Sequence, residues 1–331
     1  MTTILAVSLA LVPISILSCF LYSRRMRRQA VGQLVRQQGP RSHAPKAGTP
    51  TMGGAVILAL WVLAVLAMLP QWSQPRSIAL VLASGAIFGG IGWLDDWLSI
   101  RKSRSKGLGV VQKLGLASLA SIALFFFFAD VLRAPVAVPF TSIRVALPPV
   151  ATFFLTWFVF LATTNSLNLA DGLDGLGGGL AGLILCGLLV LSPARDSLVL
   201  GLPLIAAVLG FLWMNAHPAA LFMGDVGAFG LGGIIAAMAV ANGSAFLLPI
   251  LAGILVLEAL SVLAQTIVFR LAGVRLFKMA PFHHHFEAAT APEGQTCLFR
   301  SFEWPETRVT ARFLIVQALF VALAAWAGHA I

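Results

Sequence analysis

An amide and two carboxylates, Asn168, Asp171 and Asp174, stand at three-residue spacing in the stretch NSLNLADGLDGLGGG (165–179). On a helix each step of three residues turns by about 300°, so the three side chains would lie along one flank of a single turn and converge on one ligand. An EF-hand calcium loop would require a bidentate glutamate where the sequence has Gly182. The stretch therefore predicts an oxygen-rich site that is not of the EF-hand type.

The glycines in and after this stretch have a separate explanation in helix packing. Gly175 and Gly179, and likewise Gly178 and Gly182, have the small-xxx-small spacing that lets helices approach closely in membranes. Packing accounts for these glycines without a ligand.

Three further aspartates occur in glycine-containing motifs. Asp95 and Asp96 are adjacent in GWLDDW (92–97), near the end of a predicted helix. Carboxylates there oppose the helix macrodipole, so either they are solvated charges or a metal ion or a cationic neighbour compensates them. Asp225 stands in FMGDVG (222–227), where glycines let backbone approach an anionic ligand. A lone carboxylate of this kind suits Mg²⁺, which takes one or two protein carboxylates together with phosphate oxygens and water.

Three consecutive histidines, His283, His284 and His285, lie in FKMAPFHHHFE (277–287). An interfacial loop of amphipathic side chains is one interpretation. Zinc is another, but three consecutive imidazoles cannot all face one ion, and no cysteine lies close in sequence. Imidazoles near several aspartates better suit a diphosphate and its metal.

Glu258 is an acid inside an apolar span, where a carboxylate is costly unless it pairs or faces a cavity. A structural pair with Gln265 or with a neighbouring helix remains open, and so does a functional role.

The elements that position these residues follow from the composition. Of the 331 residues, 59% are hydrophobic and 10% are charged, and the mean hydropathy is +0.93. Soluble domains are far less apolar, so the sequence predicts an all-α integral membrane protein. About ten transmembrane helices are expected, and the first apolar run, which lacks a small-residue cleavage site, reads as a retained helix. The expected spans are 3–23, 52–69, 77–94, 114–132, 148–167, 176–192, 198–214, 227–241, 246–269 and 309–331.

The basic residues set the orientation, because lysine and arginine in short loops stay on the cytoplasmic side. With both termini periplasmic, all but four of the 22 lysines and arginines lie in cytoplasmic loops; the four are Arg76, Arg133, Arg144 and Arg195. Residues 1–331 then form one polytopic membrane domain with an active site at the cytoplasmic face. Its cytoplasmic loops are about 24–51, 95–113, 168–175, 215–226 and 270–308. The net charge of +10 is explained by this asymmetry and by anionic membrane lipid, so no nucleic acid is needed.

At the level of motifs, the chain resembles the phospho-N-acetylmuramoyl-pentapeptide transferase family of polyprenyl-phosphate sugar-phosphate transferases. The resemblance extends over nearly the whole chain. The matching motifs are GPRSHAPKAGTPTMGG (39–54), LDDW (94–97), KGL (106–108), NSLNLADGLDGL (165–176), GFLWMNAHPAALFMGDVG (210–227), LSVLAQ (260–265), FKMAPFHHHFE (277–287) and WPETRV (304–309). Of these, APFHHHFE separates this family from relatives that transfer N-acetylhexosamine phosphates.

The resemblance implies a reaction and its partners. Phospho-N-acetylmuramoyl-pentapeptide would pass from UDP-MurNAc-pentapeptide to undecaprenyl phosphate, giving lipid I and UMP for peptidoglycan biosynthesis. The enzyme would need Mg²⁺ and would work as a homodimer in the bacterial cytoplasmic (inner) membrane.

The resemblance also implies roles for single residues. Asp225 would be the metal ligand, and Asp95 and Asp96 would act beside the phosphates as a base or as positioning groups. The remaining catalytic residue is Lys106, which with Lys46 would neutralise phosphate charge. Among the substrate-binding residues, Asn168, Asp171 and Asp174 would border the nucleotide and phosphates. Asn215 and Phe222 would line the uridine pocket, with Phe222 stacked on the base, and Gln265 and Ala280 would lie near that pocket. The remaining substrate-binding residues would be His283, His284 and His285.

Two rival functions and several departures from the family pattern remain. A sibling transferase could use another UDP-sugar, and an ion-coupled transporter could use the carboxylates, although transporters place their sites near the midplane.

Ala170 and Ala228 replace a usual threonine and serine, and 288–302 is an apparent extra segment in the last cytoplasmic loop.

Overall fold

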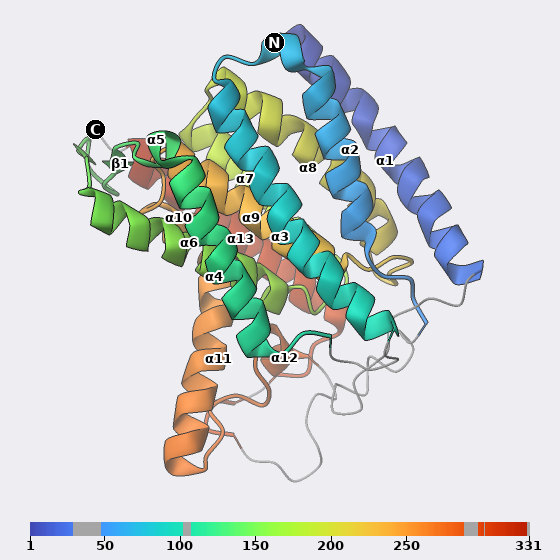
Figure 1. The fold of residues 1–331 in the computed structure, drawn as a ribbon. Helices are drawn as coiled ribbons and strands as arrows, with labels where there is room; N and C mark the ends of the chain where they lie inside the picture. The colour runs from blue at the N-terminus through green and yellow to red at the C-terminus, as the bar shows by residue number, and fades with distance from the viewer. Residues whose placement is uncertain (29–47, 102–106, 288–296, 301, 330–331) are drawn as a thin grey trace.

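The computed structural model describes residues 1–28, 48–101, 107–287, 297–300 and 302–329, and it is mostly helical (Figure 1). Eight of the described helices are long and apolar enough to cross a membrane. They are α1 (Thr2–Arg28), α3 (Pro75–Arg101), α4 (Val110–Phe127), α6 (Pro149–Ala170), α8 (Arg195–Asn215), α9 (Gly224–Ala241), α11 (Gly253–Ala272) and α13 (Glu306–His329). Two shorter apolar helices, α2 (Gly53–Ala67) and α7 (Leu176–Leu191), coincide with the two remaining predicted spans. The predicted all-α membrane architecture is confirmed.

Short elements connect these helices. They are the 3₁₀ helix η2 (Leu69–Gln71), the single turns α5 (Ala129–Leu132), α10 (Leu248–Leu251) and α12 (His283–Phe286), and the strands β1 (Val136–Ala137) and β2 (Arg144–Val145). The two strands pair antiparallel, with Val136 opposite Val145. The hairpin tip packs on α13, because Phe140 donates its N–H to the Ala327 carbonyl at 2.7 Å and its ring lies 5.3 Å from Trp326.

Helix α9 is the centre of the bundle, with 83% of its 18 residues buried. Glycines bring α2 and α3 against it. A Cβ on Gly92 of α3 would lie 2.1 Å from the Asp225 carbonyl oxygen, and one on Gly54 of α2 would lie 2.1 Å from the Cα of Gly227. These contacts fix the first turn of α9, where Asp225 lies, against both neighbours.

The two ends of the bundle differ. The N-terminus and the end of α13 both lie at the upper end in Figure 1, while α12 lies at the lower end and α11 projects beyond the other helices. The termini therefore share one end, as the prediction requires, and the side of the membrane that each end faces stays a prediction from the basic residues. Helix α3 continues to Arg101, so Asp95 and Asp96 lie within a helix and not in the loop expected to begin at 95.

Candidate active site

Three helices bring a carboxylate cluster together at the lower end of the bundle. Asp95 comes from α3 and Asp225 from the first turn of α9, and Lys113 of α4 forms an ion pair with both. The Lys113 Nζ lies 2.8 Å from Oδ2 of Asp95 and donates a second bond to Oδ2 of Asp225. Asn168 of α6 donates from Nδ2 to the other Asp225 oxygen at 2.8 Å. Motifs that are far apart in sequence thus meet on one carboxylate.

Asp96 fixes the start of α9. Its two carboxylate oxygens accept the backbone N–H groups of Asp225 and Val226 at 3.2 and 3.0 Å. These N–H groups belong to the first turn of a helix, where the macrodipole favours negative charge. Gly224 has a φ of 74°, and a Cβ there would lie 2.6 Å from Asp96 Oδ2. Asp96 therefore orients Asp225, and glycine is required beside it.

Lys113 is the functional residue that sequence reasoning missed. The resemblance points to Lys106 and Lys46, and both lie outside the described residues. Asp95 accepts the backbone N–H of Leu108, which ties the segment before α4 to the same carboxylate. The available signal was the position of Lys113, one turn inside an apolar helix, where a cation usually has a partner.

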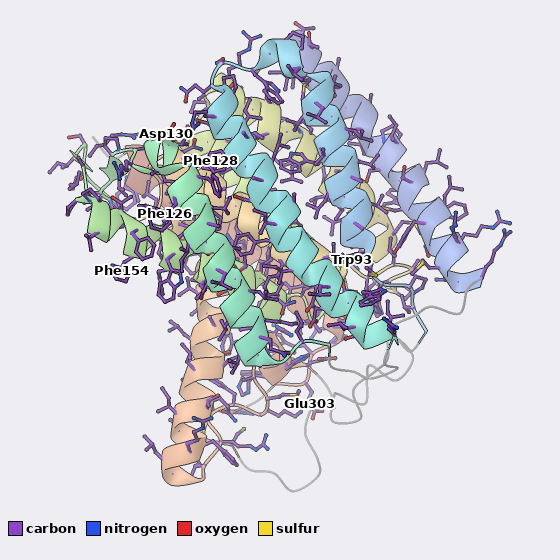
Figure 2. The ribbon with its side chains drawn as sticks, in the orientation of Figure 1. Trp93, Phe126, Phe128, Asp130, Phe154 and Glu303 are labelled. Atoms are coloured by element: carbon purple, nitrogen blue, oxygen red, sulfur yellow. The ribbon has the colours of Figure 1, made fainter. Side chains whose placement is uncertain are left out.

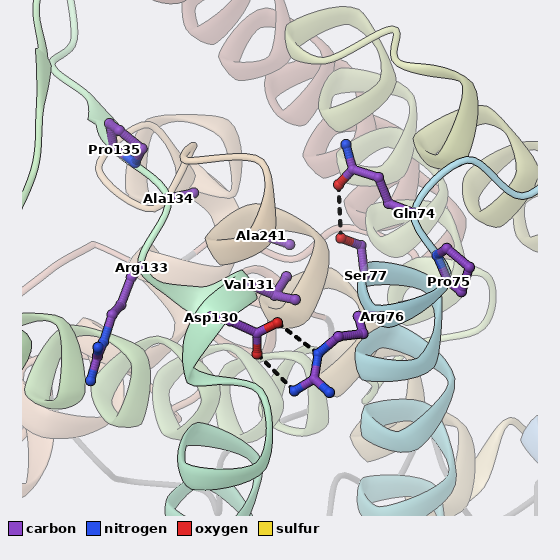
Figure 3. Close-up of a pocket in the computed structure, with 10 residues that line it drawn as sticks. All are labelled: Gln74, Pro75, Arg76, Ser77, Asp130, Val131, Arg133, Ala134, Pro135 and Ala241. Carbon is purple, nitrogen blue, oxygen red and sulfur yellow. Dashed lines mark hydrogen bonds and ion pairs between the residues drawn. The ribbon is translucent and has the colours of Figure 1, made fainter.

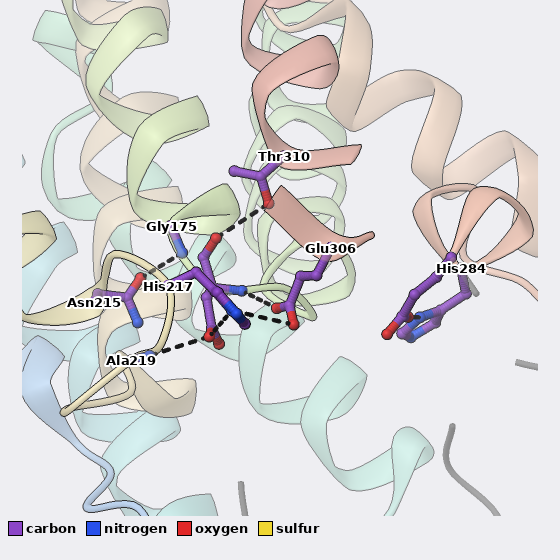
Figure 4. A network of polar contacts seen from close by, with 9 residues as sticks. Gly175, Asn215, His217, Ala219, His284, Glu306 and Thr310 are labelled. Carbon is purple, nitrogen blue, oxygen red and sulfur yellow. Dashed lines mark hydrogen bonds and ion pairs between the residues drawn. The ribbon is translucent and has the colours of Figure 1, made fainter. Parts of the chain in front are cut away.

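Asp174 is the centre of a second polar network, whose members His217, Ala219, Glu306 and Thr310 are labelled in Figure 4. Its side chain is 2% exposed, and its Oδ2 lies 3.0 Å from His217 Nδ1 and accepts the Ala219 N–H at 3.1 Å. Glu306 Oε2 lies 3.7 Å from the same nitrogen of His217. Ligand atoms of Asp174, His217 and Glu306 all lie within 4.8 Å of one another, close enough to hold a cation. Each carboxylate already accepts a backbone N–H, so hydrogen bonding alone accounts for the arrangement.

The backbone around Asp174 is held from two other elements. Glu306, the first residue of α13, accepts the Asp174 N–H at 2.6 Å, and Thr310 donates to the Asp174 carbonyl at 3.1 Å. Asn215, at the end of α8, accepts the Gly175 N–H at 3.0 Å. The WPETRV motif thus serves to position the loop 171–175 (Figure 4).

We expect Glu306→Ala to leave the Asp174 N–H without this acceptor, at a cost of about 1–3 kcal/mol in stability. Amide exchange in residues 171–175 should become faster, as measured by hydrogen–deuterium exchange. Glu306→Gln retains an acceptor and should restore protection. The control is Glu303→Ala, because that side chain is 71% exposed. Unchanged exchange in Glu306→Ala would show that other contacts hold the loop.

The single turn expected for Asn168, Asp171 and Asp174 is not formed, because α6 ends at Ala170. Asn168, in the last turn of α6, contacts Asp225, whereas Asp174 belongs to the second network. Asp171 lies against the start of α7, where a Cβ on Gly177 would be 2.3 Å from its Oδ1. The glycines Gly178 and Gly179 do serve close packing: a Cβ there would lie 3.0 Å from Leu212 of α8 and 2.7 Å from Leu314 of α13, respectively.

The three histidines are all buried, and each uses Nδ1 differently. His283 Nδ1 lies 3.2 Å from Glu258, His284 Nδ1 lies 3.0 Å from Glu287, and His285 Nδ1 accepts the Lys278 N–H at 3.1 Å. Burial lowers the pKa of His285, which keeps that ring neutral and able to accept. These different partners agree with the argument against one shared zinc ion.

Glu258 has a partner that the sequence did not suggest. Its carboxylate is fully buried and accepts the backbone N–H of His283 at 3.3 Å besides facing its ring. Of the alternatives that the sequence left open, a pair with Gln265 is not formed, since the Gln265 oxygen accepts the N–H groups of Leu276 and Phe277, both at 3.0 Å. A Cβ on Gly172 would lie 2.4 Å from His283 Nε2, so the histidine motif packs directly on the loop 171–175.

The residues expected around uridine lie in two segments. Asn215 is 3% exposed, and its Nδ2 donates to the Leu221 carbonyl at 2.9 Å, so its amide closes the loop 216–223. In that loop the backbone N–H of Phe222 donates to the Pro50 carbonyl, and the Phe222 carbonyl accepts the Gly53 N–H, both at 2.8 Å. Ala280 lies in the other segment, between Gln265 and the histidines. A pocket shared by these residues stays a prediction.

Comparisons with known proteins identify the family of the chain. The glycosyl transferase family 4 pattern matches residues 78–243, which include Asp95, Asp96, Lys113, Asn168 and Asp225. The site thus belongs to a membrane-embedded transferase of that class. A phospho-N-acetylmuramoyl-pentapeptide-transferase signature matches residues 46–58. A phospho-N-acetylmuramoyl-pentapeptide-transferase of Rubrobacter xylanophilus is 38% identical over 318 residues, covering 91% of this chain and 90% of the relative. The chain belongs to the phospho-N-acetylmuramoyl-pentapeptide-transferase family, which sets the transporter alternative aside.

Proposed function

We propose that the protein transfers phospho-N-acetylmuramoyl-pentapeptide from UDP-MurNAc-pentapeptide to undecaprenyl phosphate, producing lipid I and UMP for the cell wall. The observation that carries this proposal is the convergence of Asp95, Asp96 and Asp225 with Lys113 at one end of an apolar bundle. A diphosphate donor needs charge compensation, and a lipid acceptor needs a site at the membrane surface. Location in the bacterial cytoplasmic membrane and a homodimeric state belong to the same proposal.

The carboxylate cluster fits a divalent cation. Two aspartates pair with one lysine and a third binds the start of α9, so the cluster has a formal charge of −2 when all four groups are ionised. Carboxylate oxygens are the ligands that Mg²⁺ prefers, and it takes one or two of them besides phosphate oxygens and water. Asp225 would hold Mg²⁺, which when bound would neutralise charge on the donor diphosphate. Asn168 and Lys113 hold Asp225 in place for that task.

In this mechanism the protein positions the two phosphates and does little proton transfer. A phosphate monoester has a second pKa of about 6, so the acceptor phosphate is already mostly a dianion at neutral pH. Asp95 instead holds Lys113 and the Leu108 backbone. Lys113 would balance phosphate charge, and the loop 171–175 would border the nucleotide.

We expect Asp95→Asn to lower turnover on the order of a hundredfold, because misplacement of a positioned charge has effects of that size. The loss should be the same from pH 6 to pH 9, measured at saturating Mg²⁺ with wild-type protein in parallel. Recovery toward wild-type turnover at high pH would instead identify Asp95 as the base that deprotonates the acceptor.

Phe222→Ala should weaken binding of the UDP-sugar by about 1–3 kcal/mol, the range measured for base–aromatic stacking. The Michaelis constant for the donor should rise and that for the lipid acceptor should not. Phe20→Ala is the control, since Phe20 lies on the outer face of α1 and is 48% exposed. An unchanged Michaelis constant for the donor would show that the uracil base does not stack on Phe222.

The direct test is UMP release by purified protein supplied with both substrates, with and without Mg²⁺. A panel of UDP-sugars with radiolabelled lipid products separates this function from that of a sibling transferase. Release that depends on Mg²⁺ and occurs only with UDP-MurNAc-pentapeptide supports the proposal, and transfer from another UDP-sugar alone refutes it.

A further inference from the structure

The upper end of the bundle carries a cavity that the proposed reaction does not use. It has a volume of about 700 Å³ and lies between the start of α3, the turn α5 and the end of α9 (Figure 3). Two arginines, Arg76 and Arg133, and one aspartate, Asp130, line it. None of these three side chains belongs to the carboxylate cluster.

One of the two arginines is held in a fixed orientation. Arg76 Nε lies 2.6 Å from Asp130 Oδ2, and its Nη2 donates to Asp130 Oδ1 and to the Phe127 carbonyl, both at 2.8 Å. Its guanidinium also lies 5.7 Å from the centroid of the Phe128 ring. The hydrogen bond from Arg76 lowers the pKa of Asp130, so this carboxyl is ionised at neutral pH.

The second arginine leaves the cavity with an excess of positive charge. Arg133 is exposed, points away from the Arg76–Asp130 pair in Figure 3, and has no side-chain partner in the described part of the chain. Two guanidinium groups and one carboxylate give a net charge of +1. Guanidinium groups are the side chains best suited to bidentate recognition of phosphate.

The depth and surroundings of the cavity indicate where a phosphate would come from. Arg76 precedes Asp95 on α3 by 19 residues, about 28 Å along a helix, which is close to the ~30 Å thickness of a hydrocarbon core. With Asp95 at one headgroup layer, Arg76 lies at the other. Exposed rings occur near the end of α4, four residues before Asp130: Phe126 is 72% exposed and packs on Phe153, which in turn contacts Phe154, itself 57% exposed (Figure 2).

We propose that this cavity binds the headgroup of an anionic phospholipid, with the phosphodiester on Arg133 and the acyl chains along Phe126 and Phe154. The charge excess selects an anionic lipid over a zwitterionic one. The exposed rings distinguish a lipid from a free phosphate, because only the lipid can cover them.

Native mass spectrometry of the full chain in detergent tests this site with phosphatidylglycerol, phosphatidylethanolamine and inorganic phosphate as probes. Phosphatidylglycerol should bind more tightly than phosphatidylethanolamine. Arg133→Gln should weaken phosphatidylglycerol binding about tenfold, as expected for loss of a charge-assisted hydrogen bond, and Arg133→Lys should weaken it less. Arg195→Gln, at an exposed arginine that begins α8 outside the cavity lining, should have no effect.

Three outcomes would overturn the proposal. Equal binding of phosphatidylglycerol by wild-type protein and Arg133→Gln would show that the headgroup does not bind in this cavity. Equal binding of the two phospholipids would refute selection by charge. Displacement of phosphatidylglycerol by stoichiometric inorganic phosphate would identify a free-anion site.

Discussion

Asp225→Asn should reduce turnover about a thousandfold or more, the upper range for removing one preorganised electrostatic group. Asparagine has nearly the same shape, and its oxygen can still accept from Asn168 or Lys113, so the fold around α9 should persist. What is lost is the negative charge that would bind Mg²⁺. The measurement is UMP release at ordinary Mg²⁺ concentration, with the melting temperature recorded for each protein.

The matched control for this variant is Glu303→Gln, which removes a carboxylate charge from an exposed side chain in the chain segment just before α13. It should retain near-normal turnover. Near-normal turnover of Asp225→Asn itself would defeat the assignment of Asp225 as the metal ligand. Raising Mg²⁺ should not restore the variant, because an amide oxygen is a poor substitute for a carboxylate in holding the ion.

Gly92→Ala should also abolish most activity, although residue 92 is not expected to touch either substrate. The added methyl group would lie 2.1 Å from the Asp225 carbonyl oxygen and 2.6 Å from the Val226 nitrogen, so α3 and α9 must separate. Overpacking of this kind typically costs about 1–3 kcal/mol in stability. A displacement of about 1 Å between Asp96 and Asp225 would cost on the order of a hundredfold in turnover.

Gly90→Ala provides a control on the same helix, because a Cβ at Gly90 has no heavy atom within 4 Å. Its helix propensity change is the same as that of Gly92→Ala, so any difference between the two variants reports the contact with α9. Turnover and melting temperature should be near wild type for Gly90→Ala. Normal turnover in Gly92→Ala would show that the spacing of α3 and α9 does not set the site geometry.

Apolar length and charge asymmetry were sufficient to predict the helices from the sequence. Each span was bounded by polar residues, and the cost of exposing backbone in lipid leaves helices as the only solution for such a chain. The same reasoning predicted that acids from three loops would share one end of the bundle. Asp95, Asp96 and Asp225 do lie there, in contact through Lys113 or the start of α9.

Contacts between helices could not be predicted, because they depend on how the helices rotate and where each one ends. The sequence placed Lys113 in the cytoplasmic loop expected at about 95–113. In the structure Lys113 lies on α4, beside Asp95 and Asp225. The spacing of Asn168 and Asp174 suggested one face of one turn, but α6 ends between them. The pair of Glu258 with His283 joins residues 25 positions apart through a segment with no helical period.

The lengths of α2 and α7 have a consequence for how the lipid acceptor reaches Asp225. These helices have 15 and 16 residues, so they extend only about 22 and 24 Å, some 6–8 Å less than a typical hydrocarbon layer. Both begin beside the site, α2 at the Phe222 carbonyl and α7 next to Asp174. Such hydrophobic mismatch either thins the adjoining bilayer or leaves a water-filled depression in the protein. In both cases the phosphate headgroup of the proposed acceptor would be able to descend to the carboxylates while its isoprenoid tail stays in the membrane.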